Sequence, residues 1–246
     1  MRLSQRAEAL GTENAFVVLA EVNRLVRGGA DIVSFCIGQP DFPTPVHVQD
    51  AAVAAIRAGR HGYTPSAGID ELRAAAATSM GVLRGIEISA DEVVVGAGAK
   101  PFIGYTIASV TDYGAGDEVI FPVPGFPIYE SQIIANGAVP VPLPLREARG
   151  FAFDPAELAA RIGPKTRLLI LNSPHNPTGG ILDRAALKAI AEVLRTHPSV
   201  WIYADEIYSK LVYDGEFASI ASLPGMSVKP GRLPSTSPVD ACLNSA

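Results

Sequence analysis

The segment LLILNSPHNPTGG, residues 168–180, decides the fold class of this chain. Its first four residues form an unbroken apolar run, and Asn172 then begins a loop whose two prolines exclude a helix or a central strand. A strand that is apolar at every position is typical of a parallel sheet covered on both faces. An amphipathic run follows at Asp183–Arg195, so the segment predicts a strand, a loop and a helix.

The same alternation extends outward from this segment. Further strands are expected at Val93–Val95, at Glu118–Phe121, at Val200–Ala204 and, as a proline-limited edge strand, at Val139–Leu145. The helices expected between the strands are Pro101–Thr111, Ile128–Ala135 and Pro155–Ile162. This pattern predicts an α/β fold, a three-layer αβα domain around a mostly parallel sheet. In such sheets ligands bind beyond the carboxyl ends of the strands.

Toward the amino terminus the pattern is helical, and toward the carboxyl terminus it stops. We expect helices at Asn14–Arg27, His47–Ala58 and Ile69–Leu83, separated by loops that contain Pro and Gly. After Met226 the periodicity is lost. These changes divide the chain into three regions, which are residues 1–45, 46–226 and 227–246.

Composition narrows the classes of function. The 246 residues are 48% hydrophobic and 18% charged, against about 25% charged in an average domain, so a sizeable core is expected. A net charge of −5 provides no basic surface for nucleic acid. Cys36 and Cys242 are far apart, and neither a disulfide framework nor a metal site is expected. No apolar run approaches the ~20 residues of a membrane span, so we expect a cytoplasmic protein without a membrane partner.

Four loops that follow predicted strands carry the candidate functional residues. Gly96–Pro101 has the small residues and the helix start of an anion cradle. Asn172–Gly180 holds Asn and His side chains between prolines, and Phe126 stands between prolines where it can stack on a planar ring. Asp205 ends an apolar strand, where a carboxylate needs a cation or a hydrogen-bond donor.

Each loop taken alone leaves a second interpretation open. Gly96–Pro101 can be a tight turn without a ligand, and Asn172–Gly180 can be an Asx turn. Phe126 can be a core aromatic residue, and Asp205 can cap the turn that follows it. Gly96-x-Gly98 after a strand also suggests a nicotinamide-dependent dehydrogenase. Pro101, however, stands where the third glycine of that fingerprint belongs, and no acid ends the next strand. Dinucleotide binding is therefore disfavoured.

Together and in this order, the loops resemble class I/II aminotransferases of the pyridoxal-phosphate (PLP) fold type I group, of the aspartate aminotransferase kind. The matching stretches are Gly38–Phe42, Tyr63–Gly68, Pro124–Phe126, Asn172–Gly179 and Asp205–Tyr208. The resemblance covers residues 14–226. It implies amino-group transfer between an amino acid and a 2-oxo acid, PLP as the cofactor, and a homodimer. Region 1–45 then becomes an arm with a substrate loop, and region 46–226 becomes the PLP-binding large domain.

The resemblance also implies a role for each matched residue. Gly98, Ala99 and Lys100 match the residues that contact the cofactor phosphate, and Phe126 matches the residue that stacks on the ring. Asp205 matches the carboxylate that keeps the ring nitrogen protonated, and Asn176 and Tyr208 match the donors to the phenolic oxygen. Tyr63 matches the residue that contacts the phosphate of the neighbouring subunit. For the substrate, the matched residues are Gly38 and Asn176.

The resemblance fails downstream of Asp205. There the family has a Gly-x-Ser-Lys segment whose lysine forms the Schiff base with the cofactor and shuttles the proton. This chain has Leu233–Cys242 in that region, without a lysine. Lys210 follows Asp205 too closely and has the wrong strand parity, and Lys229 comes early. No catalytic residue is therefore assigned.

The chain accordingly resembles a C-terminally truncated aminotransferase with little or no activity. The large domain would be incomplete, because two family strands that lie between Val93–Val95 and the strand ending at Asp205 are missing. Region 227–246 would be an irregular tail unlike the family. The alternatives are a non-catalytic dimer partner and an inactive remnant.

Overall fold

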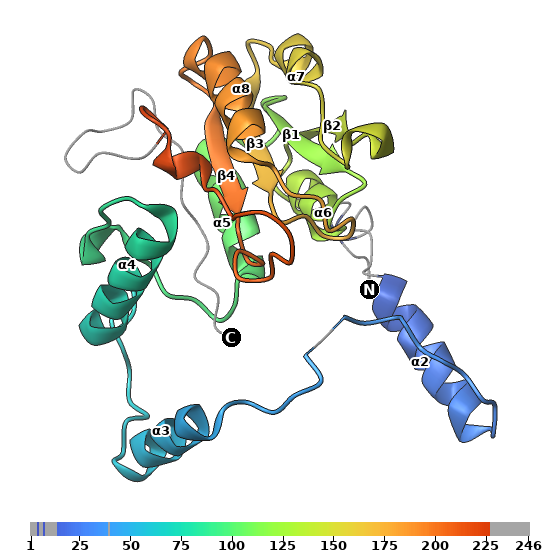
Figure 1. The fold of residues 1–246 in the computed structure, drawn as a ribbon, viewed down its shortest axis with the longest axis vertical. Helices are drawn as coiled ribbons and strands as arrows, with labels where there is room; N and C mark the ends of the chain where they lie inside the picture. Colours follow the sequence, from blue (N-terminus) through green and yellow to red (C-terminus); the bar gives the residue numbers. More distant parts are fainter. Residues whose placement is uncertain (1–3, 5–6, 8–13, 39, 227–246) are drawn as a thin grey trace. The chain divides into compact units, whose positions relative to one another are not determined.

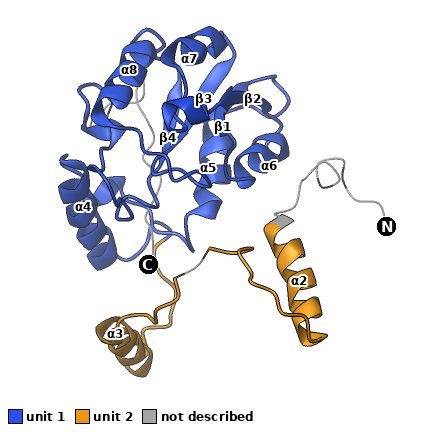
Figure 2. Ribbon diagram, turned by 45° about the vertical axis from the view of Figure 1, so that its right-hand side comes forward, with its two compact units in different colours: residues 1–11, 66–246 blue, residues 12–65 orange. Residues whose placement is uncertain are grey.

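The computed structural model of this 246-residue chain describes residues 4, 7, 14–38 and 40–226. The chain divides into two compact units, residues 12–65 and residues 1–11 with 66–246, which Figure 2 shows in different colours. The larger unit contains the sheet. The three regions inferred from the sequence stay a prediction.

The sheet of the larger unit has four parallel strands in the order β2-β1-β3-β4. The strands are β1 (Glu118–Val123), β2 (Val139–Pro144), β3 (Thr166–Asn172) and β4 (Trp201–Asp205). The proline-rich β2 lies at an edge, where a missing N–H costs no ladder hydrogen bond. Four predicted strands and the parallel sheet are thereby confirmed.

Helices cover both faces of this sheet, as Figure 1 shows. On one face α5 (Lys100–Val110) and α6 (Ile128–Ala135) share an apolar cluster with Leu168 and Ile170 of β3. On the other face α7 (Pro155–Arg161) and α8 (Arg184–Arg195) share a cluster with Leu169 and Leu171. Because successive side chains of a strand point to opposite faces, the apolar run at the start of residues 168–180 contributes side chains to the apolar clusters on both faces of the sheet. The three-layer αβα architecture is confirmed.

Side-chain caps set where two of these helices begin. The Asp154 carboxylate accepts the N–H of Ala156 at the start of α7, and the Asp183 carboxylate accepts the N–H of Ala186 at the start of α8. Such caps satisfy backbone donors that a helix start leaves without partners. Two short helices, η2 (Glu147–Arg149) and η3 (Ile220–Ser222), are also present, and η3 contributes Ile220 to the cluster of α7 and α8.

The predicted strand Val93–Val95 is wrong. The helix α4 (Asp70–Arg84) and the short helix η1 (Ala90–Glu92) precede it, and the segment pairs with no strand of the described sheet. Its backbone bonds elsewhere, since the Arg73 guanidinium donates to the Val93 carbonyl and the Val95 N–H donates to Ala67. Val93–Val95 has the apolar side chains of a strand, but no neighbouring strand is present in the described part of the chain to pair with it. The described sheet therefore ends at β4.

The smaller unit contains α2 (Asn14–Arg27) and α3 (Val46–Arg57), as the sequence pattern predicts. None of its described residues is buried, and large apolar side chains such as Phe16, Phe35 and Ile56 are exposed. Among the described helices, none combines the length and the apolar character needed to cross a membrane.

Candidate functional site

The carboxyl ends of β1, β3 and β4 lie at one edge of the sheet, and a predicted site residue ends or follows each of them. Phe126 follows β1, Asn176 follows β3, and Asp205 is the last residue of β4. The start of α5, with Lys100, faces the same group of side chains, because the Lys100 ammonium lies 5.3 Å from the centre of the Phe126 ring. Four sequence motifs are therefore brought together.

Asp205 is the buried centre of this group, with 6% of its surface exposed. Its Oδ2 accepts the Tyr129 hydroxyl at 2.7 Å, and its Oδ1 accepts the Ile207 N–H at 3.4 Å. Burial raises the pKa of the Asp205 carboxyl, and these two hydrogen bonds oppose the rise. No cation of the described residues pairs with it. The site therefore presents a carboxylate that a bound cation would stabilise.

A contact between Asn176 and Tyr208 joins the loops after β3 and β4. The Asn176 side-chain amide donates to the Tyr208 hydroxyl at 3.4 Å, and both side chains are half-buried. An amide N–H and a phenolic O–H can both donate to one acceptor oxygen of a ligand. The two residues expected to share one function are thus neighbours.

The loop before α5 has the backbone of an anion cradle. Gly98 has φ +84°, a conformation that favours glycine, and a side chain at Gly96 would approach the Phe102 ring to 2.7 Å. Ala99 precedes the first turn of α5, and Lys100 begins it with an exposed side chain. The positive end of a helix and a lysine together favour a phosphate.

The loop after β3 holds a buried histidine. His175 Nδ1 lies 2.8 Å from the Thr178 hydroxyl, while Nε2 has no hydrogen-bond partner among the described residues. Burial lowers the pKa of His175 to about 4, so the ring is neutral at physiological pH. Its hydrogen bonds lie within its own loop, which indicates that His175 supports the loop's shape.

Tyr129 and Arg84 are site neighbours that sequence reasoning missed. Tyr129 stands three residues after Phe126, and their rings meet edge to face with centroids 5.7 Å apart. Phe126 lies just before α6 and Tyr129 lies in its first turn, so a short separation in sequence is the one signal that links them. Arg84 of α4 contacts Glu206 at 2.8 Å, a pairing across 122 residues that no local pattern announces. This contact gives the buried Glu206 a cationic partner within the chain.

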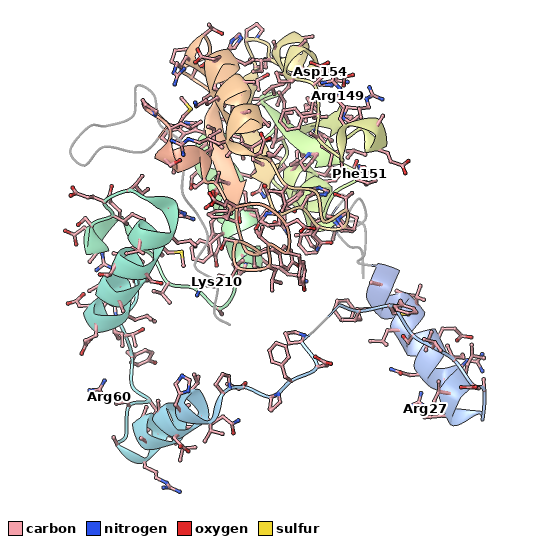
Figure 3. All side chains as sticks on the ribbon, in the orientation of Figure 1. Arg27, Arg60, Arg149, Phe151, Asp154 and Lys210 are labelled. Atoms are coloured by element: carbon pink, nitrogen blue, oxygen red, sulfur yellow. The ribbon has the colours of Figure 1, made fainter. Side chains whose placement is uncertain are left out.

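Two predicted site residues lie outside the larger unit. Gly38 and Tyr63 belong to the smaller unit, and both are exposed, so their roles stay predictions. Lys210, labelled in Figure 3, is exposed and follows β4 by five residues, and its exclusion as the cofactor lysine stays a prediction. Lys229 and Leu233–Cys242 lie outside the described residues.

Comparison with known proteins places this arrangement in a family. The family model of class I and II aminotransferases matches residues 30–236. An arginine–pyruvate transaminase of Pseudomonas aeruginosa is 40% identical over 212 residues, which are 86% of this chain and 53% of that protein. A bifunctional aspartate aminotransferase and glutamate/aspartate-prephenate aminotransferase of Petunia hybrida is 36% identical over 225 residues, which are 91% of this chain and 47% of that protein.

A solved structure gives the same result. The aspartate aminotransferase of Thermus thermophilus with maleate is 35% identical and superposes with a TM-score of 0.87, covering 92% of this chain and 58% of the other. The chain spans about half the length of the curated relatives it matches. The match over residues 30–236 covers most of the sequence, and the sheet and its helices agree with the fold type I architecture. The chain therefore belongs to the class I and II aminotransferases, a family of PLP-dependent enzymes of fold type I.

Proposed function

We propose that this chain binds PLP at the carboxyl edge of its sheet and forms the cofactor-holding part of an aminotransferase. The observation that carries the proposal is the buried carboxylate of Asp205, which is hydrogen-bonded by Tyr129 but has no cationic partner among the described residues. A protonated pyridine nitrogen supplies the missing charge. When bound and protonated, PLP provides an electron sink for the α-carbon of an amino acid.

The other described residues fit the remaining groups of this cofactor. Gly98, Ala99 and Lys100 are proposed to meet the phosphate at the start of α5, where the helix dipole and the Lys100 ammonium are positive. The half-buried Phe126 offers an aromatic face to the ring, and the neighbouring donors Asn176 and Tyr208 bind its phenolic oxygen. The proposed site thus has a negative charge, that of Asp205, at the ring nitrogen and a positive charge, that of Lys100, at the phosphate. These charges are opposite to those of a protonated pyridine nitrogen and a phosphate.

The substrates proposed for the whole protein are an amino acid and a 2-oxo acid. Gly38 and Asn176 are the residues proposed to meet the amino acid, and Tyr63 is proposed to reach the phosphate in a second subunit of a homodimer. A cytoplasmic location belongs to the same proposal. The family resemblance supports these points, and the exposure of Tyr63 leaves it free for contact with a second copy.

A ligand titration tests the cofactor proposal. The 246-residue chain is titrated with PLP, with pyridoxal and with NAD⁺, and binding is followed by protein fluorescence and calorimetry. We expect saturable binding of PLP, at least tenfold weaker binding of pyridoxal because the phosphate contacts are lost, and none of NAD⁺. Asp205→Ala should weaken PLP binding at least tenfold, whereas Asp214→Ala, which removes an exposed carboxylate, should not.

The outcomes of this titration discriminate between functions. Absence of saturable PLP binding, or equal binding by Asp205→Ala and Asp214→Ala, would contradict the proposed site. Binding of NAD⁺ in place of PLP would favour the dehydrogenase interpretation. Co-purification with a longer family member, without PLP binding, would favour a non-catalytic dimer partner.

We further propose that the 246-residue chain by itself transfers amino groups slowly or not at all. No lysine matches the family's proton-shuttling position, and a positioned base contributes roughly 10²–10⁴-fold to such steps. The assay measures transfer from aspartate and from arginine to 2-oxoglutarate and to pyruvate. Turnover in the typical enzyme range of about 1–10³ s⁻¹ would contradict this proposal.

A further inference from the structure

Asn172 is a buried amide that contacts both functional loops at once. It is the last residue of β3, its side chain is buried, and it stands opposite Asp205 in the parallel register of β3 and β4. Its Oδ1 accepts the backbone N–H of Asn176 at 2.8 Å. Its Nδ2 donates to the backbone carbonyl of Asp205 at 2.9 Å and to that of Pro174 at 3.2 Å.

We propose that Asn172 is a positioning residue that fixes the spacing between the Asn176 amide and the Asp205 carboxylate. The inference rests on the proposed function, since these two side chains are the ones proposed to bind the phenolic oxygen and the ring nitrogen of PLP. Asn172 contacts only their backbones. It therefore acts through Asn176 and Asp205 and touches no ligand itself.

The backbone chemistry of the loop explains why this amide is needed. Pro174 and Pro177 carry no N–H, so the loop has few donors with which to attach itself to the sheet. The bonds from His175 N–H to Gly180 and from Gly179 N–H to His175 close the loop on itself. Asn172 Oδ1 is the acceptor that ties the Asn176 backbone to the strand.

The same chemistry explains why the residue is an asparagine. An amide has two donor hydrogens and an acceptor oxygen, and here both ends are used. An aspartate would keep the acceptor, but it would place a second carboxylate against two carbonyl oxygens and near the buried Asp205. A serine or alanine is too short to reach both backbones. The structure thus selects a planar group that donates on one side and accepts on the other.

The experiment compares Asn172→Ala with Asn136→Ala. Asn136 also donates its side-chain amide to a backbone carbonyl, that of Gln132 at 2.8 Å, but at the end of α6. We expect Asn172→Ala to bind PLP at least tenfold more weakly than the unaltered chain, and Asn136→Ala to bind it equally well. A second readout needs no ligand. Hydrogen exchange of the Asn176 N–H should accelerate at least tenfold in Asn172→Ala, while the Leu187 N–H in α8 stays protected.

Each outcome decides a separate point. Unchanged Asn176 exchange, or unchanged PLP affinity in a chain that binds PLP, would overturn the inference. If the unaltered chain binds no PLP, the proposed function fails, and the exchange readout still decides whether Asn172 holds the loop. Asn172→Ser provides a second variant if Asn172→Ala does not fold. Loss of Leu187 protection in both variants would make Asn172 a general folding residue and would also overturn the inference.

Discussion

Two neighbouring carboxylates at the carboxyl end of β4, Asp205 and Glu206, are both buried, but their surroundings differ. On one side, Glu206 lies 2.8 Å from the Arg84 guanidinium and accepts the Ser219 hydroxyl at 2.7 Å. On the other side, Asp205 meets the Tyr129 hydroxyl and a backbone N–H, with no cation among the described residues. A buried charge is costly unless it is paired. Glu206 is thus paired within the chain, whereas Asp205 is suited to a cation from outside.

This difference separates the carboxylate that is paired within the chain from the carboxylate that is proposed to bind the cofactor. Sequence position alone does not, because both residues belong to the same motif and both are buried. The partners decide, since Arg84 comes from a distant helix and Tyr129 is neutral. If the comparison is correct, removing the two charges should change stability in opposite directions.

The largest effect is expected for Glu206→Gln. The substitution keeps the shape of the side chain but removes the negative charge beside Arg84, whose side chain is 4% exposed. Breaking a buried ion pair from one side costs about 3–5 kcal/mol. Urea unfolding of Glu206→Gln and of the exposed control Asp214→Asn measures this cost. A loss below ~1 kcal/mol would place Glu206 among ordinary surface charges and remove one half of the comparison.

A smaller effect is expected at acidic pH from His175, a third buried titratable group in the same region. Its pKa is about 4 in the folded chain and 6.5 in its ordinary state, so the unfolded chain binds the proton more readily. Stability contributed by the neutral ring is present above pH 6.5 and is lost as the pH falls toward 4. The loss is about 2–3 kcal/mol. The free energy of unfolding is measured between pH 7 and 4 for the unaltered chain and for His175→Asn. The part of its pH dependence that comes from His175 should be absent in the variant.

Asp205→Asn should act in the opposite direction to Glu206→Gln. Burial raises the pKa of Asp205 above its ordinary 3.8, so the carboxyl stabilises the fold below that pH and loses this contribution as the pH rises through its folded pKa. An asparagine keeps an acceptor for Tyr129 without the charge. The ligand-free variant should therefore be more stable at neutral pH, by about 1 kcal/mol, with no difference at pH 3.

The control for Asp205→Asn is the same measurement with saturating PLP. The cofactor should raise the melting temperature of the unaltered chain and leave that of Asp205→Asn nearly unchanged. Equal stabilisation of both proteins would show that the charge of Asp205 does not contribute to binding. A ligand-free variant less stable than the unaltered chain would show that this carboxylate is already satisfied by Tyr129.

Most of the fold could be predicted from the sequence because local patterns determine it. The apolar run of β3 and the amphipathic run of α8 need no knowledge of distant residues. Val93–Val95 failed for the opposite reason, since a strand exists only beside another strand. The smaller unit illustrates the same limit, because its helices were predicted while the exposure of Phe16 and Ile56 was not.

The candidate site was predicted where motifs follow strand ends, and missed where contacts are remote. Asp205, Asn176 and Phe126 stand at the ends of predicted strands, so their gathering at one edge follows from a parallel sheet. The bond from Tyr129 to Asp205 joins residues 76 positions apart. Such a bond depends on the packing of α6 on the sheet, and the sequence carries no local signal for it.

The smallest effect is expected for the exposed pair Arg149 and Asp154, labelled in Figure 3. Their side chains are 2.7 Å apart, as close as the buried partners, but 53% and 31% exposed. Solvent screening reduces such pairs to about 0–1 kcal/mol, so Arg149→Ala should change stability by less than ~0.5 kcal/mol. Asp154→Ala should cost about 1 kcal/mol, because it also removes the cap at Ala156. A cost for Arg149→Ala similar to that of Glu206→Gln would mean that proximity, and not burial, sets the strength of these pairs.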